Sequence, residues 1–290
     1  MQILRRRRFL RRFAAALAVL ICGLSGLTAG AEVYTEQSGR YRLIFEDAGA
    51  IDAAVTEQIL TIFREQYVRM AEKYNPEAPR TVMCTVDPAY DGVAYASGNK
   101  ITVSAAWLQN HPGDVDCVTH ELFHVVQGYP TYDPVWLIEG MADYARNEFG
   151  MYNDLSGWGL PGFVEGQHYT NSYTVTARFL VWCVKYVNPD LVIELDSLFR
   201  RNSYTADAWV GLTGTTVDAL WEEYAAAPGL DRTVGDVDLD RSVTVSDVVA
   251  LRAAIVLGEN GRLYDIDFDR SVTVSDVVAL RALIVGGNLD

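Results

Sequence analysis

Two of the four histidines lie in the stretch CVTHELFHVVQGYP, where three residues separate His120 from His124 and Glu121 directly follows the first. Side chains four residues apart lie one above the other on an α-helix, so both imidazoles can bind a single ion. Paired imidazoles are common zinc ligands, and a neighbouring glutamate can take a proton from water held by the ion. The HExxH pattern therefore predicts zinc-dependent hydrolysis. A helix that carries two unrelated histidines is the alternative.

A third metal ligand has to come from outside this helix. One extension of the pattern needs glycine at position 127 and histidine at position 130, but the chain has Gln127 and Pro130 there. The other common source is a glutamate from a following helix, and WLIEGMADYAR supplies Glu139. Asp143 lies one turn later, where it can accept the second ring N–H of a ligating histidine. We expect Glu139 to be the third ligand and Asp143 to orient a histidine, against the alternative of a solvated helix face.

Hydrolysis also needs a donor for the negative charge that develops on the attacked carbonyl oxygen. Our candidate is Tyr173 in NSYTVTARF, with His168, Tyr169 and Tyr144 behind it. Because the chain has sixteen tyrosines, a packing role for Tyr173 stays open. The segment GVAYASGN is expected to form an edge strand that pairs with an extended substrate.

Hydrophobic periodicity predicts the elements that carry these residues. YRLIFED and TVMCTVD alternate as strands do, and DGVAYASGNKITVSAAW reads as two short strands joined at residues 97–99. A long amphipathic helix is expected over residues 51–74, and the histidine helix should be capped by Gly113 and Asp114 and end at Gly128 and Pro130. Four more helices are expected in VWLIEGMADYARNEF, TVTARFLVWCVKYV, PDLVIELDSLFRR and TVDALWEEYAA. A small sheet followed by a mostly helical half indicates an α+β domain.

The first 31 residues have the layout of a secretory signal peptide, with an arginine block, an apolar run and Ala-Gly-Ala before Glu32. We expect cleavage after Ala31, export, and no membrane span in the mature chain, with a retained anchor as the alternative. Cleavage removes six arginines, so the net charge changes from −14 to −20, with 18 basic against 38 acidic residues. This charge argues against nucleic acid as a partner. At most one disulfide can form among the three remaining cysteines (Cys84, Cys117 and Cys183).

An internal repeat follows a Pro/Gly-containing link at residues 228–233. DVDLDRSVTVSDVVALRAAIV begins at Asp236, and DIDFDRSVTVSDVVALRALIV begins 29 residues later at Asp265. Alternating oxygen side chains followed by a helix are what a hard cation requires, so we expect two Ca²⁺ sites. The predicted ligands are Asp236, Asp238, Asp240, Thr244 and Asp247 in the first loop and Asp265, Asp267, Asp269, Thr273 and Asp276 in the second, with main-chain carbonyls from Ser242 and Ser271. Arginine replaces the usual glycine at position six, and position twelve is the shorter aspartate, which predicts weaker or altered sites.

Several motifs in fixed order resemble the basic secretory protein family of peptidases: HELFHVVQ, WLIEGMADYAR, YTVTARFLVWC and LTGTTVDALWEEY. The resemblance covers about residues 33–227. It implies a zincin-like peptidase domain over residues 32–227, with His120, His124 and Glu139 as metal ligands, Glu121 as the catalytic residue and a protein or peptide as the substrate. The chain departs from the family name in being strongly acidic.

The repeat resembles a type I dockerin, a small helical domain with two calcium loops, over residues 234–290. Each loop leads into one helix without the preceding helix of a full EF-hand. The resemblance implies docking onto a cohesin module of an extracellular, cellulosome-like scaffold in a bacterium, with two orientations possible. It implies that the recognition residues lie near the start of each helix, at Val245, Ser246, Val274 and Ser275.

These features together predict a secreted zinc peptidase carried on a scaffold. A non-catalytic scaffold component that binds protein or glycan is the main alternative, and calcium loops that only stabilise the tail are a further one. A polysaccharide hydrolase is less well supported, because no paired-carboxylate arrangement stands out beyond the zinc motif.

Overall fold

A computed structural model describes residues 31–286. The expected signal peptide lies outside the described residues, apart from Ala31. Among residues 31–286, no helix has the length and apolar character needed to cross a membrane.

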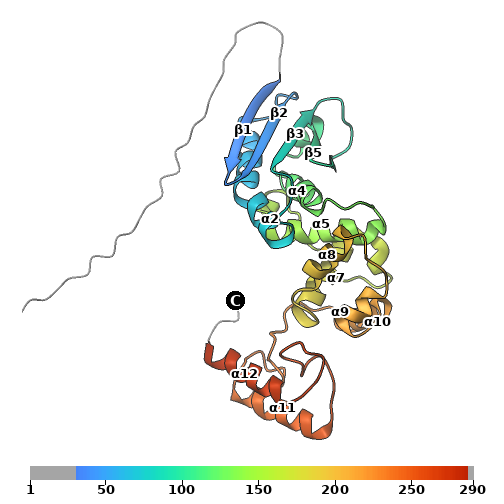
Figure 1. Ribbon diagram of the computed structural model, residues 1–290. Coiled ribbons are helices and arrows are strands. Elements are labelled where there is room, and N and C mark those ends of the chain that lie inside the picture. The colour runs from blue at the N-terminus through green and yellow to red at the C-terminus, as the bar shows by residue number, and fades with distance from the viewer. Residues whose placement is uncertain (1–30, 287–290) are drawn as a thin grey trace, which may run out of the picture. The chain divides into compact units, whose positions relative to one another are not determined.

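A five-stranded mixed sheet forms the N-terminal part of the fold (Figure 1). Its strands are β1 (Glu32–Ser38), β2 (Tyr41–Asp47), β3 (Thr81–Asp87), β4 (Ala94–Ser97) and β5 (Lys100–Ser104). Their order is β1-β2-β3-β5-β4, with parallel pairing of β3 to β2 and β5 and antiparallel pairing at both edges. The strands predicted in YRLIFED, TVMCTVD and the 97–99 hairpin are confirmed. The hairpin leaves β4 at the edge, with its outer side unpaired by any strand of the described chain.

Helices make up most of the remaining chain. The segment expected as one helix over residues 51–74 consists of α1 (Ala53–Ile62), a π-helical stretch (Phe63–Tyr67) and α2 (Val68–Tyr74). The others that concern the site are α3 (Ala105–Asn110), α4 (Cys117–Gln127), α5 (Val135–Phe149) and α7 (Tyr173–Tyr186). The rest are α6 (Asn153–Ser156), a 3₁₀ turn (Tyr169–Asn171), α8 (Leu191–Arg200), α9 (Ala208–Thr213), α10 (Val217–Ala226), α11 (Val245–Leu257) and α12 (Val274–Gly286). The α+β prediction is therefore confirmed for this part of the chain.

The histidine helix α4 lies between the sheet and the later helices. It packs against β4 and β5 on one side and against α5 on the other, and α5 packs in turn against α7. Gly128 ends α4 in the left-handed region (φ 52°), as predicted. The predicted N-terminal cap is wrong: α4 starts after Asp116, and Asp114 instead binds Trp107 and Arg146.

Two separate apolar cores are present in the described chain. The larger extends from Tyr41 to Tyr224, and a small one joins the repeats through Val237, Leu251 and Leu280. Carbonyl oxygens of Ala227 and of the link at residues 228–233 accept hydrogen bonds from side chains along one face of α7. The donors are Arg178, Trp182, Lys185 and Tyr186. The segment predicted as a linker is thus held against α7 over its length.

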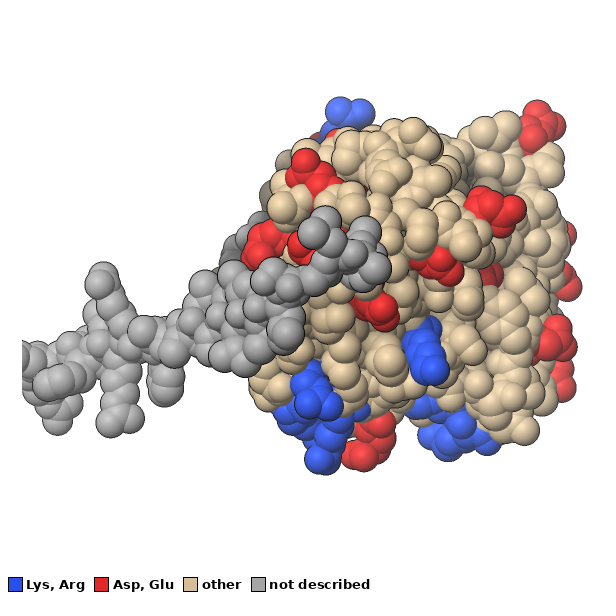
Figure 2. Space-filling model, turned by 90° about the horizontal axis from the view of Figure 1, so that it is seen from above, with Lys and Arg blue, Asp and Glu red and all other residues tan. Residues whose placement is uncertain are grey.

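Acidic side chains are spread over the face drawn in Figure 2, whereas most of its basic side chains gather along one edge. This distribution agrees with the negative net charge of the sequence.

Candidate metal centre and cleft

The imidazoles of His120 and His124 and the carboxylate of Glu139 converge on one point between α4 and α5. His120 Nε2 lies 3.1 Å from His124 Nε2 and 3.1 Å from Glu139 Oε2, and the third side of the triangle is 3.6 Å. In a tetrahedral zinc site with bonds of 2.0–2.1 Å, neighbouring ligand atoms are about 3.3 Å apart. The donor set therefore fits a four-coordinate zinc ion with three protein ligands.

Each histidine is oriented by a second hydrogen bond. His120 Nδ1 lies 2.7 Å from Asp143 Oδ1, and His124 Nδ1 lies 2.7 Å from Gln127 Oε1. Both oxygens accept, so each Nδ1 carries a proton and each Nε2 is the atom that would bind zinc. Asp143 thus lies where the sequence placed it.

Gln127 is the residue of this site that the sequence reasoning missed. The HExxH extension tests position 127 only for glycine, yet Gln127 is 1% exposed and its amide also donates to Ile138 O at 3.3 Å. Ile138 directly precedes Glu139, so one amide links a histidine on α4 to the backbone that carries the third ligand on α5. A hydrogen-bonding side chain three residues after His124 on the same helix was the signal that could have revealed it.

Electrostatics make this point attractive to a cation. Burial opposes the charge of His120, but hydrogen bonds with Asp143 and Glu139 outweigh it and raise its pKa to about 10. Burial likewise opposes the charge of Glu139, but hydrogen bonds with both histidines outweigh it and lower its pKa to about 2. The buried carboxylates therefore stabilise positive charge at the position where zinc would bind.

Glu121 lies beside the donor set without belonging to it. Its side chain is buried, and burial raises its pKa despite the nearby histidines. A backbone hydrogen bond at Ala96 on β4 has the opposite effect on this pKa. Glu121 thus projects from the histidine helix toward the edge strand β4.

Tyr173 is the first residue of α7, and its ring stacks against His120 with centroids 6.3 Å apart and planes inclined by 19°. Tyr173 and Ser172 both have positive φ angles, 50° and 67°, and the tyrosine is 52% exposed. The other side chains predicted behind it are not at the site, because none of them lines the cleft. Tyr169 donates to Asp218, His168 bonds Thr170 on the surface, and Tyr144 is buried in the core.

A cleft of about 990 Å³ contains the donor set. Its walls come from the edge of the sheet around β4, from α4 and α5, and from the loop that follows α4 through Tyr132. Both Tyr95 on β4 and Tyr132 are about half exposed. Ligand sites in proteins commonly have cavity volumes of about 300–1,000 Å³, so the cleft is large enough for several residues of a peptide.

The two repeat loops adopt matching conformations. Carboxylate oxygens of Asp236, Asp238 and Asp247 lie within 4.8 Å of one another, as do those of Asp265, Asp267 and Asp269. Arg241 and Arg270, at position six, have φ angles of 72° and 74°, so arginine adopts the left-handed conformation for which glycine is usual. The structure does not bring Asp240 into the first group or Asp276 into the second. Both Asp247 and Asp276 accept backbone N–H groups of their own loops.

The two predicted threonine ligands, Thr244 and Thr273, directly precede α11 and α12. Thr244 accepts from the Ser246 N–H and forms a capping box with Asp247, and Thr273 accepts from the Ser275 N–H. All four residues predicted to recognise a partner are exposed (Val245, Ser246, Val274 and Ser275). They therefore lie at equivalent places on the two helices.

A family model described as "Peptidase of plants and bacteria" matches residues 28–224. Among solved structures, the chain is similar to an M1 zinc metallopeptidase from Deinococcus radiodurans, with 14% identity over 70% of this chain and 53% of that one and a TM-score of 0.43. It is also similar to a variant of an M1 zinc metallopeptidase from Deinococcus radiodurans with a bound Tyr-Ser-Ala substrate, with 16% identity over 67% and 51% and a TM-score of 0.42. The chain thus spans about half the length of these structures. No curated protein matches it.

Proposed function

The chain belongs to the family of peptidases of plants and bacteria, and on that premise we propose that it is a zinc-dependent peptidase. The observation that carries the proposal is the convergence of His120, His124 and Glu139 with separations suited to tetrahedral zinc. Bound zinc would activate a water molecule for attack on the scissile carbonyl.

The protein groups around the ion then have distinct tasks. Glu121 accepts the proton of the attacking water and delivers it to the leaving amine. The Tyr173 hydroxyl donates to the carbonyl oxygen as it becomes negative. Asp143 and Gln127 hold the histidine rings in the tautomer that leaves each Nε2 free. β4 offers its unpaired edge to the extended backbone of the substrate.

Activity and metal content, measured on the same preparations, test the peptidase proposal. Wild-type protein should contain one zinc per chain and cleave casein or gelatin until a chelator is added. Glu121→Gln should keep its zinc and lose activity by about 10²–10⁴-fold, because it lacks the proton acceptor. Glu165→Gln, which changes an exposed glutamate outside the cleft, is the matched control. If the wild-type protein binds zinc without cleaving any protein, the chain is a binding component of a scaffold instead.

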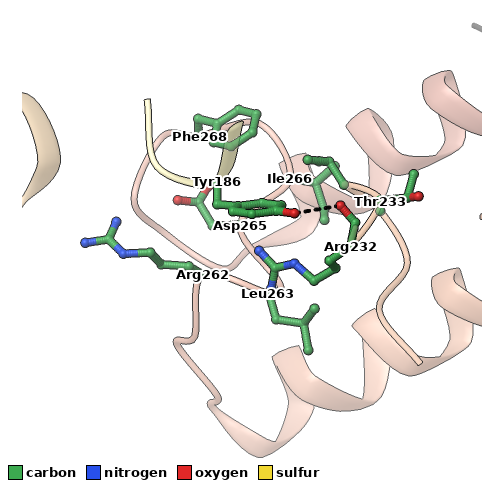
Figure 3. A pocket seen from close by; sticks show the side chains of 10 residues that line it. Tyr186, Arg232, Thr233, Arg262, Leu263, Asp265, Ile266 and Phe268 are labelled. Atoms are coloured by element: carbon green, nitrogen blue, oxygen red, sulfur yellow. Dashed lines mark hydrogen bonds between the residues drawn. The ribbon is translucent and has the colours of Figure 1, made fainter. Parts of the chain in front are cut away.

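We also propose that residues 234–290 form a type I dockerin that binds calcium and a cohesin module. Asp265 supports the calcium site independently of the sequence repeat. This side chain is 7% exposed, its Oδ1 has no hydrogen-bond partner, and it lines a small pocket with Tyr186, Arg232 and Phe268 (Figure 3). A buried carboxylate oxygen without a partner is costly, and a cation beside it would satisfy it.

The equivalent exposed valines support the docking surface. Val245 and Val249 on α11 are 69% and 65% exposed, and their counterparts Val274 and Val278 on α12 are 69% and 64% exposed. Each helix therefore presents the same apolar strip, which favours one type of partner in two related orientations. The leader-like first 31 residues favour export, so we place the protein outside a bacterial cell, on a cellulosome-like scaffold.

Calorimetric titration of the mature chain with a recombinant type I cohesin tests this second proposal. Binding should occur with calcium and disappear with EDTA. Paired replacement of Val245 and Val274 by aspartate should abolish it, whereas the same change at the exposed Val33 of β1 should not. Calcium-independent binding, or no binding in calcium, would contradict the dockerin assignment.

A further inference from the structure

The cleft continues beyond Glu121 toward the start of α4. Cys117 lies one helical turn before Glu121, and Arg146 lies one turn after Asp143 on α5, and both line the cleft. Trp107, at α3, and Trp158, in the loop after α6, line it as well. The loop that contains Tyr132 follows the other end of α4. A bound peptide therefore has cleft walls on both sides of the metal centre.

Charges at the Cys117 end are satisfied within the protein. Asp114 pairs with Arg146, and their side chains are only 13% and 6% exposed. Asp114 also accepts from Trp107 Nε1 at 2.9 Å, and Arg146 donates to Asn153 Oδ1 at 3.0 Å. Burial raises the pKa of the Cys117 thiol well above its ordinary value, which keeps it neutral. Among the described residues that line this end of the cleft, the charged pair Asp114 and Arg146 is therefore already satisfied and offers little to a charged substrate side chain.

Two partly buried indoles remain as the apolar walls of this end. The Arg146 guanidinium lies 4.4 Å from the centroid of the Trp158 ring, and the His111 ring stacks on Trp107 with centroids 3.9 Å apart. Each indole is thus supported on one face by a neighbour, which fixes its orientation before a substrate binds. Rigid aromatic walls interact favourably with a flat aromatic side chain, beyond the gain from burial alone.

We propose that Trp107, Cys117 and Trp158, backed by the Asp114–Arg146 pair, form a subsite for a large uncharged aromatic side chain, Phe or Tyr, of the substrate. This aromatic residue of the substrate would lie next to the scissile bond, on the side that faces Cys117. The inference rests on the proposed peptidase function. A Lys or Glu side chain is disfavoured there, because it would lose its hydration without gaining a partner.

Peptide binding to Glu121→Gln tests the subsite without turnover. Fluorescence anisotropy would compare labelled alanine-rich hexapeptides that carry one Phe, Lys, Glu or Ala. The Phe peptide should bind at least ~10-fold more tightly than the others, and adding Trp158→Ala should remove this preference. Trp158→Phe should keep most of it, which separates a recognition role from a folding defect. Adding Tyr132→Ala, at the other end of the cleft, should leave the ratio between Phe and Ala peptides unchanged.

Wild-type cleavage of the same peptides then locates the aromatic residue. Cleavage should occur with Phe at one fixed position beside the broken bond. Trp158→Ala should abolish the requirement for Phe at that position. An aromatic preference that survives in Trp158→Ala, or a preference for Lys or Glu, overturns the subsite. If the binding preference holds and the wild type cleaves no peptide, the subsite stands and the peptidase proposal alone fails.

Discussion

Replacing Gln127 by alanine should weaken zinc binding although Gln127 is not a metal ligand. The substitution removes the 2.7 Å hydrogen bond at His124 Nδ1 and the 3.3 Å bond to Ile138 O. Because Gln127 is 1% exposed, its loss leaves the Nδ1–H of the largely buried His124 without an acceptor. Groups that orient metal ligands typically contribute about 10–100-fold to metal affinity, which corresponds to about 1.4–2.7 kcal/mol. We therefore expect the zinc Kd to rise by that factor.

Competition with a chromophoric zinc chelator measures this Kd directly, and urea denaturation of the metal-free proteins measures folding separately. Asn75→Ala is the matched control, because Asn75 donates an amide hydrogen bond to Val126 O on the same helix but contacts no ligand. It should change the free energy of unfolding while leaving the zinc Kd unchanged. If Gln127→Ala bound zinc as tightly as the wild type, the idea that this amide positions His124 would be wrong.

Three further outcomes are expected. Tyr173→Phe should lower kcat for peptide hydrolysis by about 10²-fold with little change in KM, because the hydroxyl acts only as the carbonyl oxygen becomes negative. An equally large loss of peptide affinity in a binding assay would argue for a packing role instead. Asp265→Ala should reduce the calcium stoichiometry of the mature chain from two to one in isothermal titration calorimetry, whereas unchanged stoichiometry would exclude this carboxylate as a ligand. Burial raises the pKa of Asp196 from 3.8 to about 6, so the stability contributed by its protonated carboxyl is fully present below pH 3.8 and is lost as the pH rises through 6. In urea titrations, the free energy of unfolding of the wild type, relative to that of Asp196→Asn, should therefore fall by about 2 kcal/mol between pH 4 and pH 7. A difference between the two proteins that does not change with pH would contradict the shift.

Local patterns in the sequence predicted which residues form the donor set. The four-residue spacing of His120 and His124 needs only a helix, and a glutamate with an aspartate one turn later needs only a second helix nearby. The sequence could not show that α4 and α5 would pack so that Glu139 meets both imidazoles, since this depends on tertiary contacts. The spacing of His124 and Gln127, three residues apart on one helix, is a local signal in the sequence for the contact between their side chains.

The wrong predictions share a dependence on distant partners. Asp114 was expected to cap α4, but Arg146, 32 residues away, binds its carboxylate instead. His168, Tyr169 and Tyr144 were expected behind Tyr173, but none of them lines the cleft. The strand β1 was not predicted, because its side chains are mostly exposed and show little hydrophobic alternation.

Anomalous diffraction from crystals of the mature protein at the zinc absorption edge would locate the bound metal. We expect one strong peak in the cleft, within about 2.0–2.2 Å of His120 Nε2, His124 Nε2 and a Glu139 carboxylate oxygen. A peak elsewhere, or a zinc ion bound by the two histidines with the Glu139 carboxylate turned away, would contradict this prediction.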